Sequence, residues 1–188
     1  ISNAIILKTP NNTEGDEVNN QLSCEAKALR VYSYFCLARI YQFPNAKDPN
    51  APGIPLNTEP ATSASNGNPR GSLKDVYDLI TSDLEFAVAN LTTSRIDKYR
   101  INKNVAQLIL AEVYQELAMS DNSLWAKAIS NAQAARLGYP LMTGSEYARG
   151  FNAVSNEEWL GGIRFQASQS FSFASFFFPV ILPPSLSS

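Results

Sequence analysis

Carboxylates are the side chains left to do acid–base chemistry in this chain, because its 188 residues include no histidine. Without an imidazole, the commonest general base and the Ser-His and Cys-His nucleophile pairs are excluded, as is every metal site that needs histidine. Two adjacent carboxylate pairs remain, Asp16-Glu17 and Glu157-Glu158. The first flanks a predicted helix start, where negative charge is favourable, and the second precedes a predicted strand. Neither pattern indicates burial, so we expect surface groups, no enzymatic activity and no cofactor.

Aromatic and polar side chains could instead bind sugars, whose apolar faces stack on flat rings and whose hydroxyls need polar partners. Trp125 starts a predicted helix and Trp159 occupies a predicted strand, so both are interpreted as packing residues. Four tyrosines have helical spacing and are predicted to be mostly core: Tyr32, Tyr34, Tyr41 and Tyr114. The ligand-binding candidates are Arg164 and Gln166, which leave the predicted strand toward an aromatic-rich segment.

The composition narrows the class of protein further. The 15 basic and 17 acidic residues give a net charge of -2, which argues against a nucleic-acid binder. No apolar run approaches the roughly 20 residues of a membrane helix. Cys24 and Cys36 fall on one predicted helix, about 18 Å apart, which is too far for a disulfide. We therefore expect both cysteines to be free.

The elements that must position these side chains are mostly helices. A helix is predicted over 17–43, with Leu22, Ala26, Leu29, Cys36 and Ile40 on one face. Six prolines exclude a helix from 44–71. The segment 72–75 (SLKD) is typical of a capping box and opens a helix over 72–91. Further helices are predicted over 102–119 and 124–137, the last stopped by a glycine, and a strand over 159–165.

An internal repeat relates the helices to one another. Residues 37–42 (LARIYQ) match 110–115 (LAEVYQ), and both read L-A-x-[I/V]-Y-Q. A small residue followed by an aromatic, with further small residues at helical spacing, is the tetratricopeptide pattern. We predict a mainly α fold with tetratricopeptide-like antiparallel pairs 17–43/72–91 and 102–119/124–137. Tyr41 and Tyr114 should be buried at equivalent helix crossings. A long Pro-rich loop interrupts the first pair, and a short strand and an irregular segment follow the second.

The order of several short motifs resembles the SusD/RagB family of outer-membrane nutrient-binding lipoproteins. The motifs are residues 1–6 (ISNAII), 25–35 (EAKALRVYSYF), 53–56 (GIPL), 76–80 (VYDLI), 106–114 (AQLILAEVY), 125–128 (WAKA), 138–141 (GYPL) and 158–160 (EWL). The resemblance covers about residues 1–168, the helical-repeat region. It implies that 169–188 is an irregular segment leading into a C-terminal part outside this chain.

The resemblance also implies a function. Family members are non-catalytic, surface-exposed lipoproteins of the outer membrane, anchored through an N-terminal lipid that this chain lacks. They capture glycans, starch-like or other oligosaccharides, and deliver them to a SusC-like TonB-dependent transporter. Two alternatives stay open: a peptide-binding member of the same family, and a cytoplasmic helical-repeat adaptor that binds a partner protein. The choice between glycan and peptide is not made by these residues.

The last apolar cluster of the chain leads to one more expectation. Eight apolar residues crowd the segment 171–182: Phe171, Phe173, Phe176, Phe177, Phe178, Val180, Ile181 and Leu182. A stable fold does not leave so many such side chains in water, since each is worth roughly 1.5–3 kcal/mol when buried. We therefore expect this segment to pack against missing chain or a neighbouring molecule.

Overall fold

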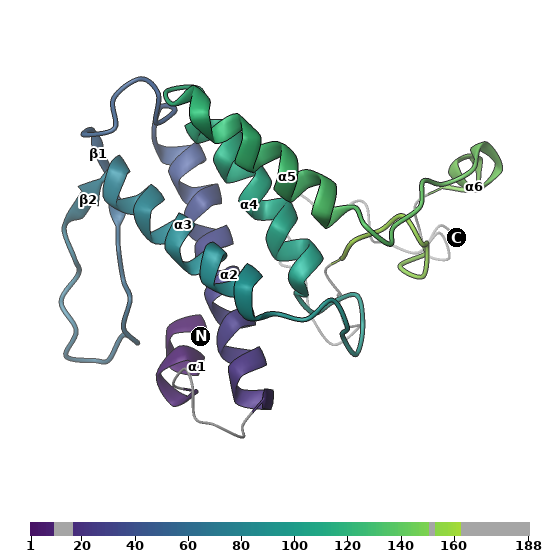
Figure 1. Cartoon of the computed structure of the whole chain (residues 1–188). Coiled ribbons are helices and arrows are strands. Elements are labelled where there is room, and N and C mark those ends of the chain that lie inside the picture. The colour runs from purple at the N-terminus through teal and green to yellow at the C-terminus, as the bar shows by residue number, and fades with distance from the viewer. Residues whose placement is uncertain (10–16, 151–152, 163–188) are drawn as a thin grey trace, which may run out of the picture.

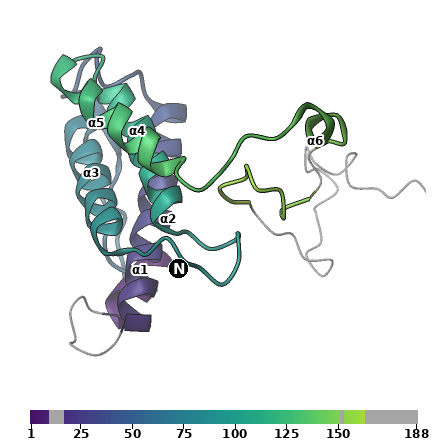
Figure 2. The same ribbon diagram turned by 45° about the vertical axis from the view of Figure 1, so that its right-hand side comes forward.

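The structure, a computed structural model, describes residues 1–9, 17–150 and 153–162. It is mainly helical, as predicted, and its long helices lie side by side (Figure 1). The elements, in chain order, are α1 (Ser2–Lys8), α2 (Glu17–Tyr41), β1 (Pro52–Pro55), β2 (Arg70–Ser72), α3 (Leu73–Asn90), α4 (Lys103–Leu117), the 3-10 turn η1 (Asn122–Leu124), α5 (Trp125–Ala135) and α6 (Gly144–Ala148). Figures 1 and 2 both show α6 apart from the helices α2 to α5.

Local signals set the helix ends close to where the sequence predicts them. Ser72 accepts a hydrogen bond from the backbone N–H of Asp75, whose carboxylate accepts one from the Ser72 N–H in return, which is the predicted capping box. Asn102 caps α4 in the same way through the N–H of Val105. Past α5, Gly138 adopts φ +87°, a backbone conformation that favours glycine. These caps fix where α3, α4 and α5 begin or end.

The helices pair antiparallel, as predicted. Between α2 and α3, Arg30 bonds Asp83, and five residues further along α2 the ring of Phe35 meets that of Tyr77 edge to face at 6.3 Å. The partner numbers fall as the α2 numbers rise, so the two helices run in opposite directions. Between α4 and α5, the Asn104 amide donates to backbone oxygens at 134, 135 and 137, whereas the Lys127 ammonium donates to the hydroxyl ten residues further along α4.

The face that α2 buries differs from the predicted one. Its core residues are Ser23, Cys24, Ala26, Ala28, Val31, Phe35 and Ala38. Of the residues predicted to face the core, Leu29 and Ile40 are exposed and Cys36 is partly exposed. The physical reason is that α2 is apolar around most of its circumference, so its sequence period does not select one face. Both cysteines are free, as expected.

The repeat is present as paired helices, but its two tyrosines are not equivalent. Tyr114 is 3% exposed, as predicted, and its hydroxyl donates to Glu85 of the preceding helix α3. Tyr41 is 66% exposed, so its predicted burial is wrong. The cause is position: α4 has long helices on two sides, α3 and α5. By contrast, α2 is the first long helix, and on its outer side only the short α1 packs against it among the described helices.

A two-stranded sheet replaces part of the predicted loop over 44–71. Strands β1 and β2 pair antiparallel, with an irregularity between the partners Pro52↔Ser72 and Pro55↔Arg70. Close approach requires Gly53, because a Cβ there would lie 2.9 Å from Cγ2 of Val76. Proline-rich strands this short carry no alternation of apolar residues, which is why the sequence did not predict them.

The strand predicted over 159–165 is wrong for the part that the structure describes. Residues 159–162 have no regular secondary structure, and 163–165 lie outside the described residues. Instead, this stretch is held by the loop before α4: the Arg95 guanidinium donates to the Leu160 carbonyl, and the Gly162 N–H donates to the Lys98 carbonyl. The predicted segment 169–188 and its apolar cluster also lie outside the described residues.

Two searches of the described residues bear on function. No helix among them combines the length and the apolar character needed to cross a membrane. Within the same residues, no three cysteine or carboxylate side chains gather as a metal site would require.

Candidate functional site

A groove of about 450 Å³ lies where α2 passes the β1–β2 sheet. We call it the hairpin groove. Its lining comes from α2, from β1 and the residue after it, and from β2: Tyr34, Leu37, Tyr41, Gly53, Ile54, Pro55, Asn57 and Arg70. Aromatic, apolar, amide and guanidinium groups therefore converge on one concave surface, which is the composition expected of a small-molecule site.

The wall that α2 contributes is aromatic. Tyr34, Leu37 and Tyr41 are spaced i, i+3 and i+7, which places them on one face of the helix. The Tyr34 hydroxyl donates to the Asn57 carbonyl at 2.7 Å and accepts from the Asn57 N–H at 2.8 Å, so its position is fixed. Tyr41 is 66% exposed and offers an open ring face. The geometry therefore combines a fixed tyrosine with one on which a flat apolar surface can stack.

The opposite wall carries the polar groups. The Arg70 Nε donates to the Gly53 carbonyl at 2.6 Å, and its Nη2 donates to the Pro52 carbonyl at 2.8 Å. The Asn57 side-chain oxygen accepts from the Asn68 amide at 3.0 Å. These bonds hold the guanidinium and the Asn57 amide at the groove, where their remaining N–H groups can donate to a ligand.

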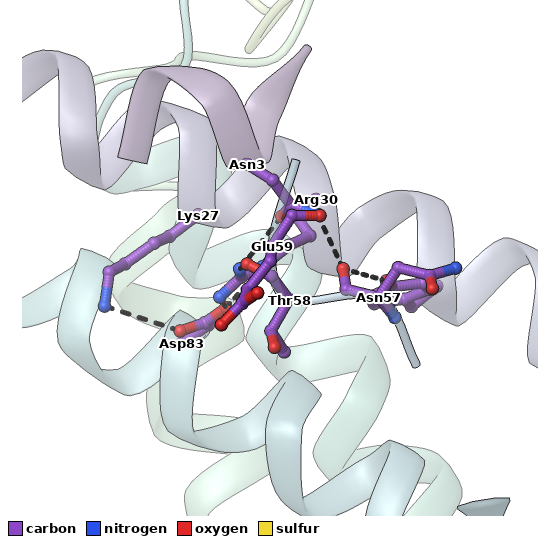
Figure 3. Close-up of polar contacts among 8 residues, drawn as sticks. Asn3, Lys27, Arg30, Asn57, Thr58, Glu59 and Asp83 are labelled. Carbon is purple, nitrogen blue, oxygen red and sulfur yellow. Dashed lines mark hydrogen bonds and ion pairs between the residues drawn. The ribbon is translucent and has the colours of Figure 1, made fainter. Parts of the chain in front are cut away.

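A buried ion pair supports the loop that forms this wall (Figure 3). Arg30 of α2 donates to Asp83 of α3 through both Nε, at 3.1 Å, and Nη2. Their side chains are 9% and 7% exposed, and Lys27 adds a second positive charge 3.6 Å from Asp83 Oδ1. Because both partners are desolvated, the pair tolerates loss of neither charge alone.

The same arginine extends the contact to the loop after β1. Arg30 Nη1 donates to the side-chain oxygen of Asn3 at 3.0 Å and to the Thr58 carbonyl at 3.4 Å. The Asn3 amide in turn donates to the carbonyls of Asn57, at 2.6 Å, and Glu59, at 3.0 Å. Figure 3 shows this polar cluster between the N-terminal helix and α3. It positions Asn57, which the hairpin groove shares.

A second concavity, of about 690 Å³, lies between the C-terminal ends of α2 and α4. Arg39 sits over the Phe35 ring at 5.1 Å, with carboxylate oxygens of Glu112 and Glu116 at 4.0 and 3.9 Å. Tyr77 donates to Glu116 at 2.7 Å, and burial, followed by this bond, raises the pKa of Tyr77 far above its ordinary value. The charged groups here already face one another, so the hairpin groove is the better ligand site.

The carboxylate pairs singled out from the sequence form no acid–base site among the described residues. Glu17 and Glu157 are exposed. Glu158 is partly buried and accepts the backbone N–H of Met142 at 2.7 Å. Asp16 lies outside the described residues.

The ligand residues predicted from the sequence and the site in the structure do not coincide. Arg164 and Gln166 lie outside the described residues, so their role stays a prediction. Tyr41, predicted as core, instead lines the groove. Its i+7 spacing from Tyr34, followed by a proline-rich segment that must return past the helix, was the available signal. Arg70 carried no such signal, because pairing of β2 with β1 brings it to the groove.

Residues 2–115 match the model of a protein family, SusD-like, that is described as starch-binding and associating with the outer membrane. The match includes every residue that lines the hairpin groove. None of the curated proteins is similar to the chain at a significant level.

Solved structures give the same result. A SusD-like carbohydrate binding protein from Bacteroides vulgatus is 31% identical, with a TM-score of 0.74 over 86% of this chain and 34% of its own. A SusD superfamily protein from Bacteroides thetaiotaomicron is 25% identical, with a TM-score of 0.65 over 78% of this chain and 32% of its own. A protein crystallised with xylogluco-oligosaccharide is 25% identical, with a TM-score of 0.58 over 75% of this chain and 28% of its own. The chain thus spans about a third of the length of these relatives.

Proposed function

The chain belongs to the SusD-like family, and from this premise we propose that it is part of a non-catalytic protein that captures oligosaccharides at the cell surface. The family is described as starch-binding and associated with the outer membrane. That description favours a surface binding protein over the cytoplasmic adaptor that the repeat pattern also allows.

One observation carries the proposal: the hairpin groove places the open ring of Tyr41 opposite the fixed polar groups of Asn57 and Arg70. A sugar ring stacked on Tyr41 would turn its hydroxyls toward those donors. Both walls are held by neighbouring elements, so the groove is formed before a ligand arrives, which lowers the entropic cost of binding. The relative crystallised with xylogluco-oligosaccharide supports a glycan as the ligand class.

The setting of this binding step follows from the family. We propose that the complete protein is held at the outer-membrane surface by an N-terminal lipid and passes its oligosaccharide to a SusC-like TonB-dependent transporter. Arg164 and Gln166 are proposed as further ligand contacts, because they follow directly on the stretch that Arg95 and Lys98 tie to the helices.

Binding to defined oligosaccharides tests the proposal. Isothermal titration calorimetry would compare xyloglucan heptasaccharide, maltoheptaose and tetragalacturonate with the wild-type chain and the Tyr41→Ala variant. We expect at least one of these oligosaccharides to bind, and Tyr41→Ala to weaken that binding by about tenfold or more, since stacking on one ring is lost.

Tyr147→Ala is the matched control, because Tyr147 is 63% exposed and lies on α6, away from the hairpin (Figure 1). It should leave affinity unchanged. If none of the oligosaccharides binds and a panel of mixed tetra- to hexapeptides does, the peptide-binding alternative replaces the proposal. Equal affinity of wild type and Tyr41→Ala for a bound oligosaccharide would move the site away from the hairpin groove.

A further inference from the structure

The charge at the hairpin groove is of one sign. Arg70 is the only ionisable cation among its lining residues, and no aspartate or glutamate lines it. The second concavity is different, because Arg39 there faces Glu112 and Glu116. A ligand entering the hairpin groove therefore meets a positive group that is not neutralised by the groove itself.

The other guanidinium groups on this part of the molecule are paired with carboxylates. Arg30 bonds Asp83, and Arg100 bonds Glu25. Among the described residues Arg70 has no ion pair within 4.0 Å, although its neighbour Gly71 lies close to Asp75. The Asp75 carboxylate accepts the N–H and hydroxyl of Ser72 in the capping box, and these bonds lower the pKa of Asp75.

The Arg70 guanidinium is also held in place. Two of its five N–H groups donate to the carbonyls of Pro52 and Gly53. The remaining three have no hydrogen-bond acceptor printed by the geometry of the described residues, and they keep the planar fork that suits a carboxylate or sulfate. A fixed, unpaired fork loses little entropy when an anionic group arrives.

From these observations we propose that the hairpin groove prefers acidic oligosaccharides, in which a sugar stacked on Tyr41 presents a carboxylate or sulfate to Arg70. The proposal rests on the proposed function and adds the class of glycan. The net charge of the chain is -2, so the preference comes from this local site rather than from long-range attraction, which salt screens beyond about 10 Å at 0.1 M.

A pair of ligands that differ in a single charge tests the preference. Tetragalacturonate and its fully methyl-esterified form share one backbone, and a κ-carrageenan tetrasaccharide with its desulfated form serves as the sulfate pair. By calorimetry at 50 mM NaCl, we expect the wild type to bind an acidic form at least tenfold more tightly than its neutral counterpart. The ratio should shrink at 500 mM NaCl, because Arg70 is partly solvated.

Variants assign the preference to one side chain. Arg70→Gln should bring the acid-to-neutral ratio close to one while the neutral form still binds within about threefold of wild type. Arg70→Lys keeps the charge without the fork, and should retain an intermediate ratio. Arg149→Gln, at the end of α6, is the control and should leave the ratio unchanged. Thermal unfolding of each variant verifies that the hairpin is still folded.

The outcomes separate this inference from the function on which it rests. Binding of neutral forms without preference for the acid, or a preference that survives Arg70→Gln in a folded variant, overturns the inference and leaves glycan binding standing. Absence of binding to every oligosaccharide tested overturns both.

Discussion

The buried ion pair between Arg30 and Asp83 allows a quantitative test of how the helices and the loop after β1 are held together. Asp83→Leu removes the acceptor of two Arg30 hydrogen bonds and the partner of Lys27. Both ion-pair side chains are under a tenth exposed, and removing one partner of such a pair costs about 3–5 kcal/mol. We expect about 4 kcal/mol for Asp83→Leu, because two cations lose their counter-charge together.

The reverse substitution should cost less. Arg30→Met leaves Asp83 with Lys27 at 3.6 Å, so we expect about 3 kcal/mol, the lower end of the range for a broken buried pair. In the double variant neither an arginine nor an aspartate is left unpaired, and apolar side chains fill the space. Its free energy of unfolding should therefore fall by no more than that of the worse single variant.

Urea unfolding followed by far-UV circular dichroism at pH 7 measures all four proteins of this cycle. A strongly non-additive result, with a coupling energy of about 3 kcal/mol or more, is expected of two groups in direct contact. Single-variant losses that add to within about 0.5 kcal/mol would refute the reasoning, because they would mean that each charge is solvated independently.

Three further predictions concern other parts of the fold. Gly53→Ala should lower stability by about 1–3 kcal/mol, since its Cβ would lie 2.9 Å from Val76 Cγ2, whereas Gly67→Ala, with nothing within 4 Å, should be near neutral in thermal unfolding. Tyr114→Ala should cost about 3–5 kcal/mol in urea unfolding, and Tyr114→Phe only about 1–2 kcal/mol for the lost hydrogen bond; equal losses would contradict the burial of the ring. Tyr77 has a folded-state pKa above its ordinary value of 10.0, so its contribution to stability is present below about pH 10 and is lost as the pH rises further. Tyr77→Phe should therefore lose less stability than wild type between pH 9 and pH 11, and parallel pH profiles would contradict this.

The boundaries of the helices were readable from sequence because their causes are local. Ser72 and Asp75 form the predicted capping box within four residues, and Gly138 stops the chain after α5 through its own backbone conformation. The pairing of helices was readable as well, because a repeated hexapeptide places the same small residue, Ala38 or Ala111, against a neighbouring helix. Both alanines are buried, as the repeat requires.

Burial around α2 was not readable, because it depends on which neighbours are present. The same L-A-x-[I/V]-Y-Q pattern leaves Tyr41 exposed and Tyr114 buried, since α4 lies between long helices and α2 does not. The candidate site was missed for a related reason. Arg70 and Tyr41 are separated by 28 intervening residues, and only the pairing of β1 with β2 brings them together. No local period records such a contact.

The loop after β1 is held almost entirely by its main-chain oxygens, and this has an evolutionary consequence. Side chains of Asn3, Arg30 and Tyr34 donate to the carbonyls at positions 57, 58 and 59, whereas the side chains of Thr58 and Glu59 are exposed. A mutation at either exposed position changes the surface beside the groove but leaves every one of those carbonyls in place. Such a loop can exchange the chemistry that it presents at little thermodynamic cost, so natural selection can retune what the surface recognises without first having to rescue the fold.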